Sequence, residues 1–124
     1  MKNFLYYWLP VFLYAVVIFY FSSLPRIPPE IVRIIPETFI LHAIEYAIFT
    51  FLLFRAFTNS KNIMLKNNKI LLSIIIATVY GIINEFYQNF IPGRIYSVFD
   101  MIANFIGSLL VTIFNIKFYN RIRI

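Results

Sequence analysis

Apolar residues run along the chain in four long stretches that short polar segments separate. The stretches cover residues 4–24, 38–57, 70–91 and 97–118. Each is close to the ~20 residues that a helix needs to cross ~30 Å of hydrocarbon. No alternation of apolar and polar residues indicates barrel strands, and a helix satisfies its own backbone hydrogen bonds in lipid. The pattern therefore predicts an all-α membrane protein, a bundle of four transmembrane helices.

Prolines punctuate these stretches in the way that is typical of helix ends. Pro25, Pro28 and Pro29 follow the first stretch, Pro36 opens the second, and Pro92 with Gly93 closes the third. Pro10 lies inside the first stretch. Because neighbouring helices can satisfy the carbonyl that a proline leaves unbonded, we interpret Pro10 as a kink within one helix.

The composition agrees with a lipid environment. The chain is 61% hydrophobic, with 15 Phe and 9 Tyr beside only 3 Gly. A chain of 124 residues forms one modest core, which is too small to hide so much apolar surface from water. We therefore expect a single transmembrane domain over residues 1–124, with membrane lipids as its surroundings. There is no cysteine, which excludes a disulfide framework, a thiolate metal site and a cysteine nucleophile.

The net charge of +6 comes from basic residues that gather on one side of the predicted bundle. One side has Lys2, Arg55, Lys61, Lys66, Lys69, Lys117, Arg121 and Arg123, and the other has Arg26, Arg33 and Arg94. This asymmetry indicates orientation in a membrane and not nucleic-acid binding. By the positive-inside rule, both termini and the 58–69 loop are predicted to be cytoplasmic. We expect a multi-pass protein of the cell membrane.

Polar and charged residues interrupt three of the four apolar stretches. They are His42, Glu45 and Tyr46 in the second, Asn84, Glu85 and Gln88 in the third, and Asp100 and Asn104 in the fourth. A charge at the centre of a span costs about 2.5–3.5 kcal/mol on insertion scales, so such residues need partners or a function. Counted at ~1.5 Å per residue, the set lies near the outer end of each helix. The spacing predicts one shared polar layer in the outer leaflet.

An anion is one possible ligand of this layer. With both termini inside, the second and fourth helices begin at the outer face and direct their positive dipole ends there. Arg94 and Arg26 are predicted to lie at the same level. Helix N-termini and arginines together favour a phosphate, and the phosphates at this depth belong to lipids or to lipid-linked phosphosugars.

Short motifs in the chain resemble the VanZ-like family in order and spacing. They are Ser22-Ser23-x-Pro25, His42-x-x-x-Tyr46, Asn84-Glu85-x-x-Gln88-x-x-x-Pro92-Gly93-Arg94 and Asp100-x-x-x-Asn104-x-x-Gly107. The resemblance covers nearly the whole chain. The chain departs from the family at Asn84, where an acidic residue is usual, and lacks the usual Asp-Lys before the histidine. These differences argue against chemistry that needs a pair of neighbouring carboxylates.

The resemblance implies a small membrane protein of the cell envelope. The member that gives the family its name is linked to resistance to the glycopeptide teicoplanin, by a mechanism that is not established. The resemblance therefore suggests a cellular setting and assigns no reaction.

Each polar residue also has a purely structural interpretation. His42 and Glu45 could be an acid-base pair, metal ligands together with Glu85 and Asp100, or a buried pair that ties the second helix to the third. Ser97 and Asp100 fit an N-terminal capping box. We interpret Asn104 first as an interhelical hydrogen bonder, with Gly107 marking close helix packing. Arg94 could form an ion pair or bind a ligand, and Ser23 is more simply a hydroxyl that bonds a free carbonyl at a helix end.

The first hypothesis is a protein that binds an anionic lipid or a lipid-linked wall precursor. Its predicted ligand-binding residues are Arg94, Gln88, Asn104, Glu45, Tyr46 and Ser23, together with His42, Glu85 and Asp100. The second hypothesis is an enzyme acting on a lipid phosphate or glycosyl bond, with His42, Glu85 and Asp100 as its catalytic residues. The third is a structural or assembly role. No cofactor is predicted, a divalent metal is kept as an alternative, and the oligomeric state is open.

Overall fold

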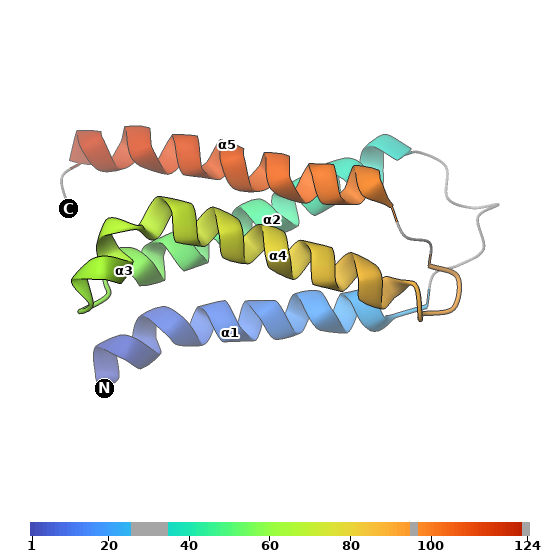
Figure 1. Cartoon of the computed structure of the whole chain (residues 1–124), viewed down its shortest axis with the longest axis horizontal. Helices are drawn as coiled ribbons and strands as arrows, with labels where there is room; N and C mark the ends of the chain where they lie inside the picture. Colours follow the sequence, from blue (N-terminus) through green and yellow to red (C-terminus); the bar gives the residue numbers. More distant parts are fainter. Residues whose placement is uncertain (26–34, 95–96, 123–124) are drawn as a thin grey trace.

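The structure is a computed structural model that describes the backbone of residues 1–25, 35–94 and 97–122 and the side chains of residues 1–25, 39–94 and 97–118. It contains α1 (Lys2–Ser23), α2 (Ile35–Thr58), α3 (Ile63–Asn67), α4 (Lys69–Gln88) and α5 (Val98–Ile122). Every regular element in these ranges is a helix (Figure 1). The predicted all-α class is therefore confirmed.

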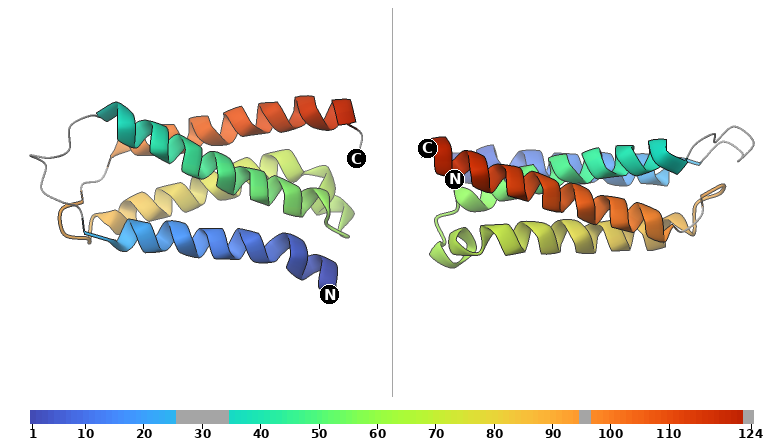
Figure 2. Two further views of the ribbon diagram at one scale, coloured as in Figure 1. Left: turned by 180° about the vertical axis from the view of Figure 1, so that it is seen from behind. Right: turned by 90° about the horizontal axis from the view of Figure 1, so that it is seen from above.

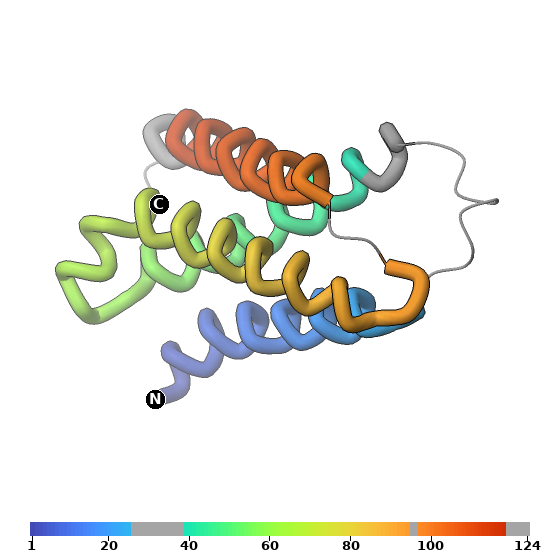
Figure 3. Tube along the Cα trace, turned by 45° about the vertical axis from the view of Figure 1, so that its right-hand side comes forward, coloured from blue at the N-terminus to red at the C-terminus, as the bar shows by residue number. Residues whose placement is uncertain are grey.

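The four long helices form a bundle in which α2 and α4 take the central positions. These two pack against each other and against α5 on one side and α1 on the other, whereas the described residues of α1 and α5 make no contact with each other. Figure 2 shows this arrangement from two further directions, and Figure 3 shows α1 on the far side of the bundle from α5. One end of the bundle carries the start of α1, the end of α5 and α3; the opposite end carries the turn after α4 (Figure 1).

The surface of the bundle is apolar. All four long helices are long and apolar enough to cross a membrane, over Lys2–Ser23, Phe39–Thr58, Lys69–Gln88 and Val98–Phe118. Large apolar side chains point outward, among them Val16, which is 64% exposed, and Leu110, which is 62% exposed. Such a surface is suited to contact with hydrocarbon, as the sequence predicts.

The interior, by contrast, holds many polar groups beside its apolar core. The buried polar side chains are Ser22, Thr50, Ser73, Asn84, Glu85, Gln88, Asp100, Asn104, Ser108, Thr112 and Asn115. Most come from α4 and α5. The described part of the chain is therefore apolar outside and partly polar inside, which is the reverse of a water-soluble protein.

Aromatic contacts attach α1 to the rest of the bundle. Phe19 stacks on Tyr87 of α4, with ring centroids 4.7 Å apart. Near the other end of α1, Trp8 meets Phe57 of α2 edge to face at 5.1 Å. Such ring pairs contribute about 0.5–1.5 kcal/mol each beyond the apolar area they bury. The first helix is thus held along its whole length.

Helix boundaries differ from the predicted ones by a few residues. The helix α1 continues through Pro10 and stops at Ser23, because Leu24 adopts an extended backbone. The helix α4 ends at Gln88, three residues earlier than predicted. The chain then turns through short-range hydrogen bonds to Gly93, whose φ of 76° is a left-handed conformation that favours glycine. The helix α2 begins at Ile35, before the predicted residue 38, and α5 continues to Ile122, beyond the predicted residue 118.

The short helix α3 was not predicted, because its segment looked like a solvated turn. Asn62 caps it, and its side-chain oxygen accepts hydrogen bonds from the backbone N–H groups of Met64 (2.9 Å) and Leu65 (3.4 Å). An Asn before an apolar residue is a usual helix-start signal, so the sequence did contain this element.

The closest helix contact in the described chain that involves a glycine joins α5 to α2. A Cβ atom on Gly107 would lie 2.0 Å from the backbone oxygen of Ala43. Only glycine permits this approach of two backbones. The prediction that Gly107 marks close helix packing is confirmed.

Candidate functional site

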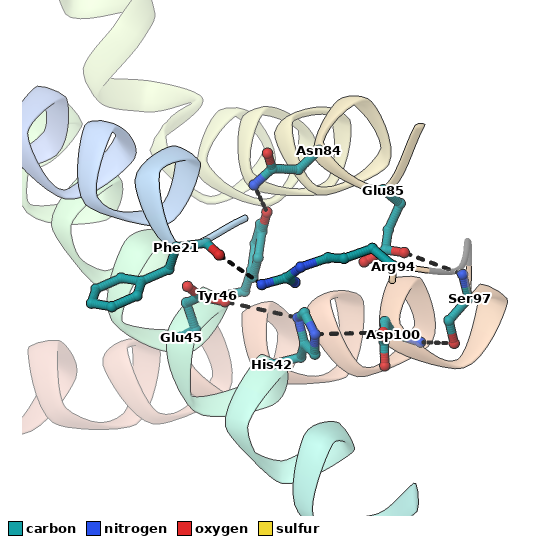
Figure 4. Close-up of polar contacts among 9 residues, drawn as sticks. All are labelled: Phe21, His42, Glu45, Tyr46, Asn84, Glu85, Arg94, Ser97 and Asp100. Carbon is teal, nitrogen blue, oxygen red and sulfur yellow. Dashed lines mark hydrogen bonds and ion pairs between the residues drawn. The ribbon is translucent and has the colours of Figure 1, made fainter. Parts of the chain in front are cut away.

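His42 on α2 lies between two carboxylates near the end of the bundle opposite α3 (Figure 4). Its Nε2 atom is 3.5 Å from Asp100 Oδ2 on α5, and its Nδ1 atom is 3.8 Å from Glu45 Oε2 on α2. The His42 and Asp100 side chains are only 13% and 11% exposed. One interpretation of His42 and Glu45 was a buried pair that ties the second helix to the third; the contact of His42 with Asp100 joins α2 to α5.

Glu85 enters the same region from α4 and is almost completely buried, at 1% exposure. Its Oε2 atom accepts a hydrogen bond from the backbone N–H of Ser97 at 3.2 Å. With the Gln88 amide oriented so that its nitrogen faces Glu85, this nitrogen donates to Glu85 Oε1 at 3.3 Å. The carboxylate is therefore fixed by partners on both oxygens.

The start of α5 uses only half of the predicted capping box. The Ser97 hydroxyl accepts from the backbone N–H of Asp100 at 3.3 Å, as expected of an N-cap residue. In a full capping box the Asp100 carboxylate would accept a hydrogen bond from the backbone N–H of Ser97. Here Glu85 accepts that hydrogen bond instead. This exchange leaves the Asp100 carboxylate available to face His42.

His42, Glu85 and Asp100 thus converge from three different helices (Figure 4). One nitrogen of His42 and one oxygen from each carboxylate all lie within 4.8 Å of one another. We call these three residues the polar cluster. The prediction of a shared polar layer is confirmed for them, and their donor atoms are of the kind that hold a metal ion or move a proton.

Acidic groups outnumber basic ones among the described side chains at this end of the bundle. The structure describes the side chains of three acidic residues, Glu45, Glu85 and Asp100, and all three lie at the polar cluster. Arg94 is the one Lys or Arg with a described side chain at the same end. Buried charges are tolerated only when opposite charge or protons balance them. The described carboxylates at the cluster therefore need positive charge or protons to balance them.

Arg94 reaches across this end to the last turn of α1. Its Nη2 atom donates to the backbone oxygen of Phe21 at 2.7 Å, and its Nε atom donates to that of Leu24 at 3.0 Å. In the Gln88 orientation given above, Nη1 also donates to the Gln88 side-chain oxygen at 3.2 Å. The guanidinium thus closes the C-terminal end of α1, a role that the sequence did not indicate.

A second polar layer lies about one helical turn deeper. Tyr46 on α2 is 1% exposed, and its hydroxyl accepts from the Asn84 side-chain nitrogen on α4 at 3.3 Å. Asn104 on α5 is 3% exposed, and its side-chain oxygen has no hydrogen-bond partner among the described residues. The expectation of an interhelical hydrogen bond is therefore not met at this oxygen. Tyr46 and Asn104 thus lie about one helical turn from His42 and Asp100 along their own helices.

Ser23 does not join the polar cluster. Its hydroxyl donates to the backbone oxygen of Phe19 at 2.8 Å, which agrees with its interpretation as a helix-end hydroxyl. It also lies 3.1 Å from the hydroxyl of Tyr87 on α4. Ser23 thus helps to fasten α1 to α4. The predicted role of Arg26 lies outside the described residues.

Sequence reasoning missed a line of buried polar residues that continues down α5. Ser108, Thr112 and Asn115 follow Asp100 and Asn104 at helical spacing, and all five are buried. The Ser108 hydroxyl accepts from Thr50 of α2 at 2.8 Å. The signal was a polar residue at every fourth position from Asp100 to Thr112. Ser and Thr are common in apolar helices, so their shared face was not noticed.

Comparison of the chain with protein families, with curated proteins and with solved structures found no match in any of the three. The site must therefore be interpreted from its own chemistry.

Proposed function

We propose that this chain is a multi-pass protein of the cell membrane that binds the phosphate-bearing headgroup of an anionic lipid or of a lipid-linked wall precursor. The observation that carries the proposal is the convergence of His42, Glu85 and Asp100 from three helices, beside the positive charge of Arg94. A chain that needed only to pack would place apolar side chains here, since buried charges cost free energy in a membrane.

The proposed orientation has the termini in the cytoplasm and the polar cluster in the outer leaflet. Support comes from the described basic side chains Lys2, Arg55, Lys61, Lys66, Lys69 and Lys117, which belong to the end of the bundle that carries α3. Arg94 belongs to the opposite end. Positive charge is enriched on cytoplasmic loops, so the end with α3 faces the cytoplasm.

Depth and access support a headgroup as the ligand. The cluster lies within the first turns of α5, close to where a membrane-spanning helix would leave the hydrocarbon. The Glu45 side chain is 28% exposed, which leaves one side of the cluster open to the surroundings. The helices α2 and α5 both begin at this end, and their dipoles favour negative charge there.

The resemblance to the VanZ-like family supports the same setting in the cell envelope. Its motif residues include the three residues of the cluster, together with Gln88 and Arg94. A link to glycopeptide (teicoplanin) resistance is part of this proposal only through the family resemblance.

Enzymatic turnover of the same headgroup is a second candidate. It is favoured by the position of His42 between two carboxylates, an arrangement that can orient an imidazole for general acid-base catalysis. The substrate bond would be a lipid phosphate or glycosyl bond. In that case Glu85→Gln abolishes turnover while headgroup affinity changes little.

The test is a lipid titration by native mass spectrometry of the detergent-purified chain. The probes are phosphatidylglycerol and a polyprenyl phosphate, with phosphatidylcholine as the comparison lipid. We expect one phosphate lipid to bind selectively and His42→Gln to weaken it about tenfold or more. Asn115→Ala serves as the control, because Asn115 is a buried polar residue on α5 far from the cluster, near the other end of that helix. The proposal would be refuted if the natural sequence, His42→Gln and Asn115→Ala all bound the phosphate lipid with equal affinity.

A further inference from the structure

We propose that His42, Glu85 and Asp100 bind one divalent transition-metal cation, Zn²⁺ or Mn²⁺, which receives the phosphate oxygen of the lipid. The inference rests on the proposed function for the phosphate and on the geometry of the cluster for the metal. These two parts can be tested separately.

The three donor atoms are already close to the arrangement that a metal requires. Oxygen and nitrogen ligands lie ~2.0–2.2 Å from such an ion, so in tetrahedral coordination two of them are about 3.3–3.6 Å apart. The donor atoms of the cluster lie within 4.8 Å of one another. The most distant pair would have to close by up to about 1.5 Å to reach bonding distance.

The charges of the described side chains suit a cation. Three carboxylates and one guanidinium have described side chains at this end. A divalent cation would add positive charge beside the carboxylates of the cluster. The cation would also attract a phosphate, in addition to Arg94 and the helix N-termini.

The residue types indicate which metal fits. Imidazole nitrogen together with carboxylate oxygen suits Zn²⁺ and Mn²⁺, whereas Mg²⁺ and Ca²⁺ prefer oxygen ligands alone. With three protein ligands, the ion keeps at least one coordination position for an outside group. That position would take the phosphate oxygen.

The neighbours of the cluster resemble the supporting groups of metal sites. A metal-bound histidine usually gives its second ring nitrogen to a carboxylate. In His42, Nε2 faces Asp100, and Nδ1 lies 3.8 Å from Glu45 Oε2, so Glu45 could hold the ring while Nε2 binds the ion once the two approach by about 1 Å. The backbone N–H of Ser97 fixes Glu85 in the same way.

One further buried group points to a polar occupant at this end. Asn104 lies one turn below Asp100 on α5, is 97% buried and has a side-chain oxygen without a hydrogen-bond partner among the described residues. Buried acceptors usually have a partner, and water is a frequent one. A hydrated metal ion above Asn104 would supply such water.

The experiment measures the metal content and the metal affinity of protein that carries no polyhistidine tag. Purified protein is analysed by inductively coupled plasma mass spectrometry and is then titrated with Zn²⁺, Mn²⁺ and Mg²⁺. We expect one Zn²⁺ or Mn²⁺ per chain, no comparable binding of Mg²⁺, and an affinity at least about 100-fold lower in His42→Gln and in Asp100→Asn. Asn115→Ala keeps the affinity of the natural sequence.

A cobalt titration checks the ligands without relying on stability. Co²⁺ bound through His42 and two carboxylates gives a visible absorption band, which disappears in His42→Gln. The inference is overturned if no ion binds with one-to-one stoichiometry, or if binding persists in both His42→Gln and Asp100→Asn. All variants are first checked for helical circular dichroism and monodispersity, and Asp100→Asn alone decides the matter if His42→Gln does not fold.

Lipid retention in the same samples, with and without a chelator, separates the two proposals. Metal binding without selective phosphate lipid supports the metal site and refutes the proposed function. Selective phosphate lipid that survives chelation supports the proposed function and overturns the metal site.

Discussion

Glu85 performs two tasks with one carboxylate. Its Oε2 atom accepts the Ser97 N–H at the start of α5, and the same side chain faces His42 and Asp100. The first task is structural, since it satisfies a donor at the helix N-terminus that is partly buried. The second task depends on its negative charge. The two tasks can be separated by substitution.

Glu85→Ala and Glu85→Gln form the matched pair for this separation. Alanine leaves the Ser97 N–H without its acceptor, and we expect a loss of about 1–3 kcal/mol in the free energy of unfolding. Glutamine keeps a carbonyl oxygen for that N–H and removes only the charge, so we expect little loss or a small gain in stability. Denaturant titration in detergent, followed by circular dichroism, measures both. Equal losses in the two variants would contradict this division of tasks.

Some residue partners could be predicted from the sequence and others could not. The rise per residue of a helix placed His42, Glu85 and Asp100 in one layer, because helices that cross the same membrane share one depth scale. The partners of Arg94 were missed, since they are backbone oxygens that no sequence pattern marks. One interpretation gave the Asp100 carboxylate to its own helix start, and the sequence did not show that Glu85, from a different helix, takes that place.

At the scale of elements, contact between helices depends on two glycines in different ways. Gly107 of α5 meets the backbone of α2 at Ala43, which cannot move without moving the helix. Gly81 of α4 meets side chains instead: an added Cβ would lie 2.9 Å from Asn104 Nδ2 and 3.1 Å from a ring carbon of Tyr46. Side chains can rotate away more easily than a backbone can shift.

Gly107→Ala and Gly81→Ala therefore differ in their expected effect. We expect Gly107→Ala to destabilise the bundle by about 3 kcal/mol or to prevent folding, since it forces α2 and α5 apart. Gly81→Ala should cost about 1 kcal/mol or less, because Asn104 can adjust. Thermal unfolding of both variants in the same detergent compares them. A larger loss for Gly81→Ala would mean that the contact between α2 and α5 is not the tighter one.

The four long helices were predictable, because a membrane-spanning helix has a minimum length and an apolar composition. Their ends were less predictable. The end of α4 at Gln88 is set by a turn that leads into Gly93, and the apolar residues Phe90 and Ile91 concealed it. A hydropathy pattern does not distinguish an apolar turn from the last turn of a helix.

At the scale of the whole molecule, the proposed outer-leaflet site depends on the orientation of the protein in the membrane. The natural sequence has no cysteine, so single cysteines can be introduced without background labelling. Asn67 lies at the end of α3, and Asn89 follows α4 at the opposite end; both are exposed. They form a matched pair of asparagine positions.

We expect Asn89→Cys to react with a membrane-impermeant maleimide in intact cells, because the proposed orientation places it outside. Asn67→Cys should react only after the cells are permeabilised. Labelled protein is detected by its mass shift on a gel. The reverse pattern would place the polar cluster on the cytoplasmic side and refute the outer-leaflet site.

The polar face of α5 also bears on how the protein is made. A helix that carries Asp100, Asn104, Ser108 and Thr112 on one face enters lipid less readily than an apolar helix does. In chain order α5 follows α2 and α4, the helices that cover this face. Its partners therefore leave the ribosome first and can receive it as it emerges. The order of the helices in the chain therefore suits their order of insertion. The helix α5, which most needs partners to cover its polar face, is translated after α2 and α4.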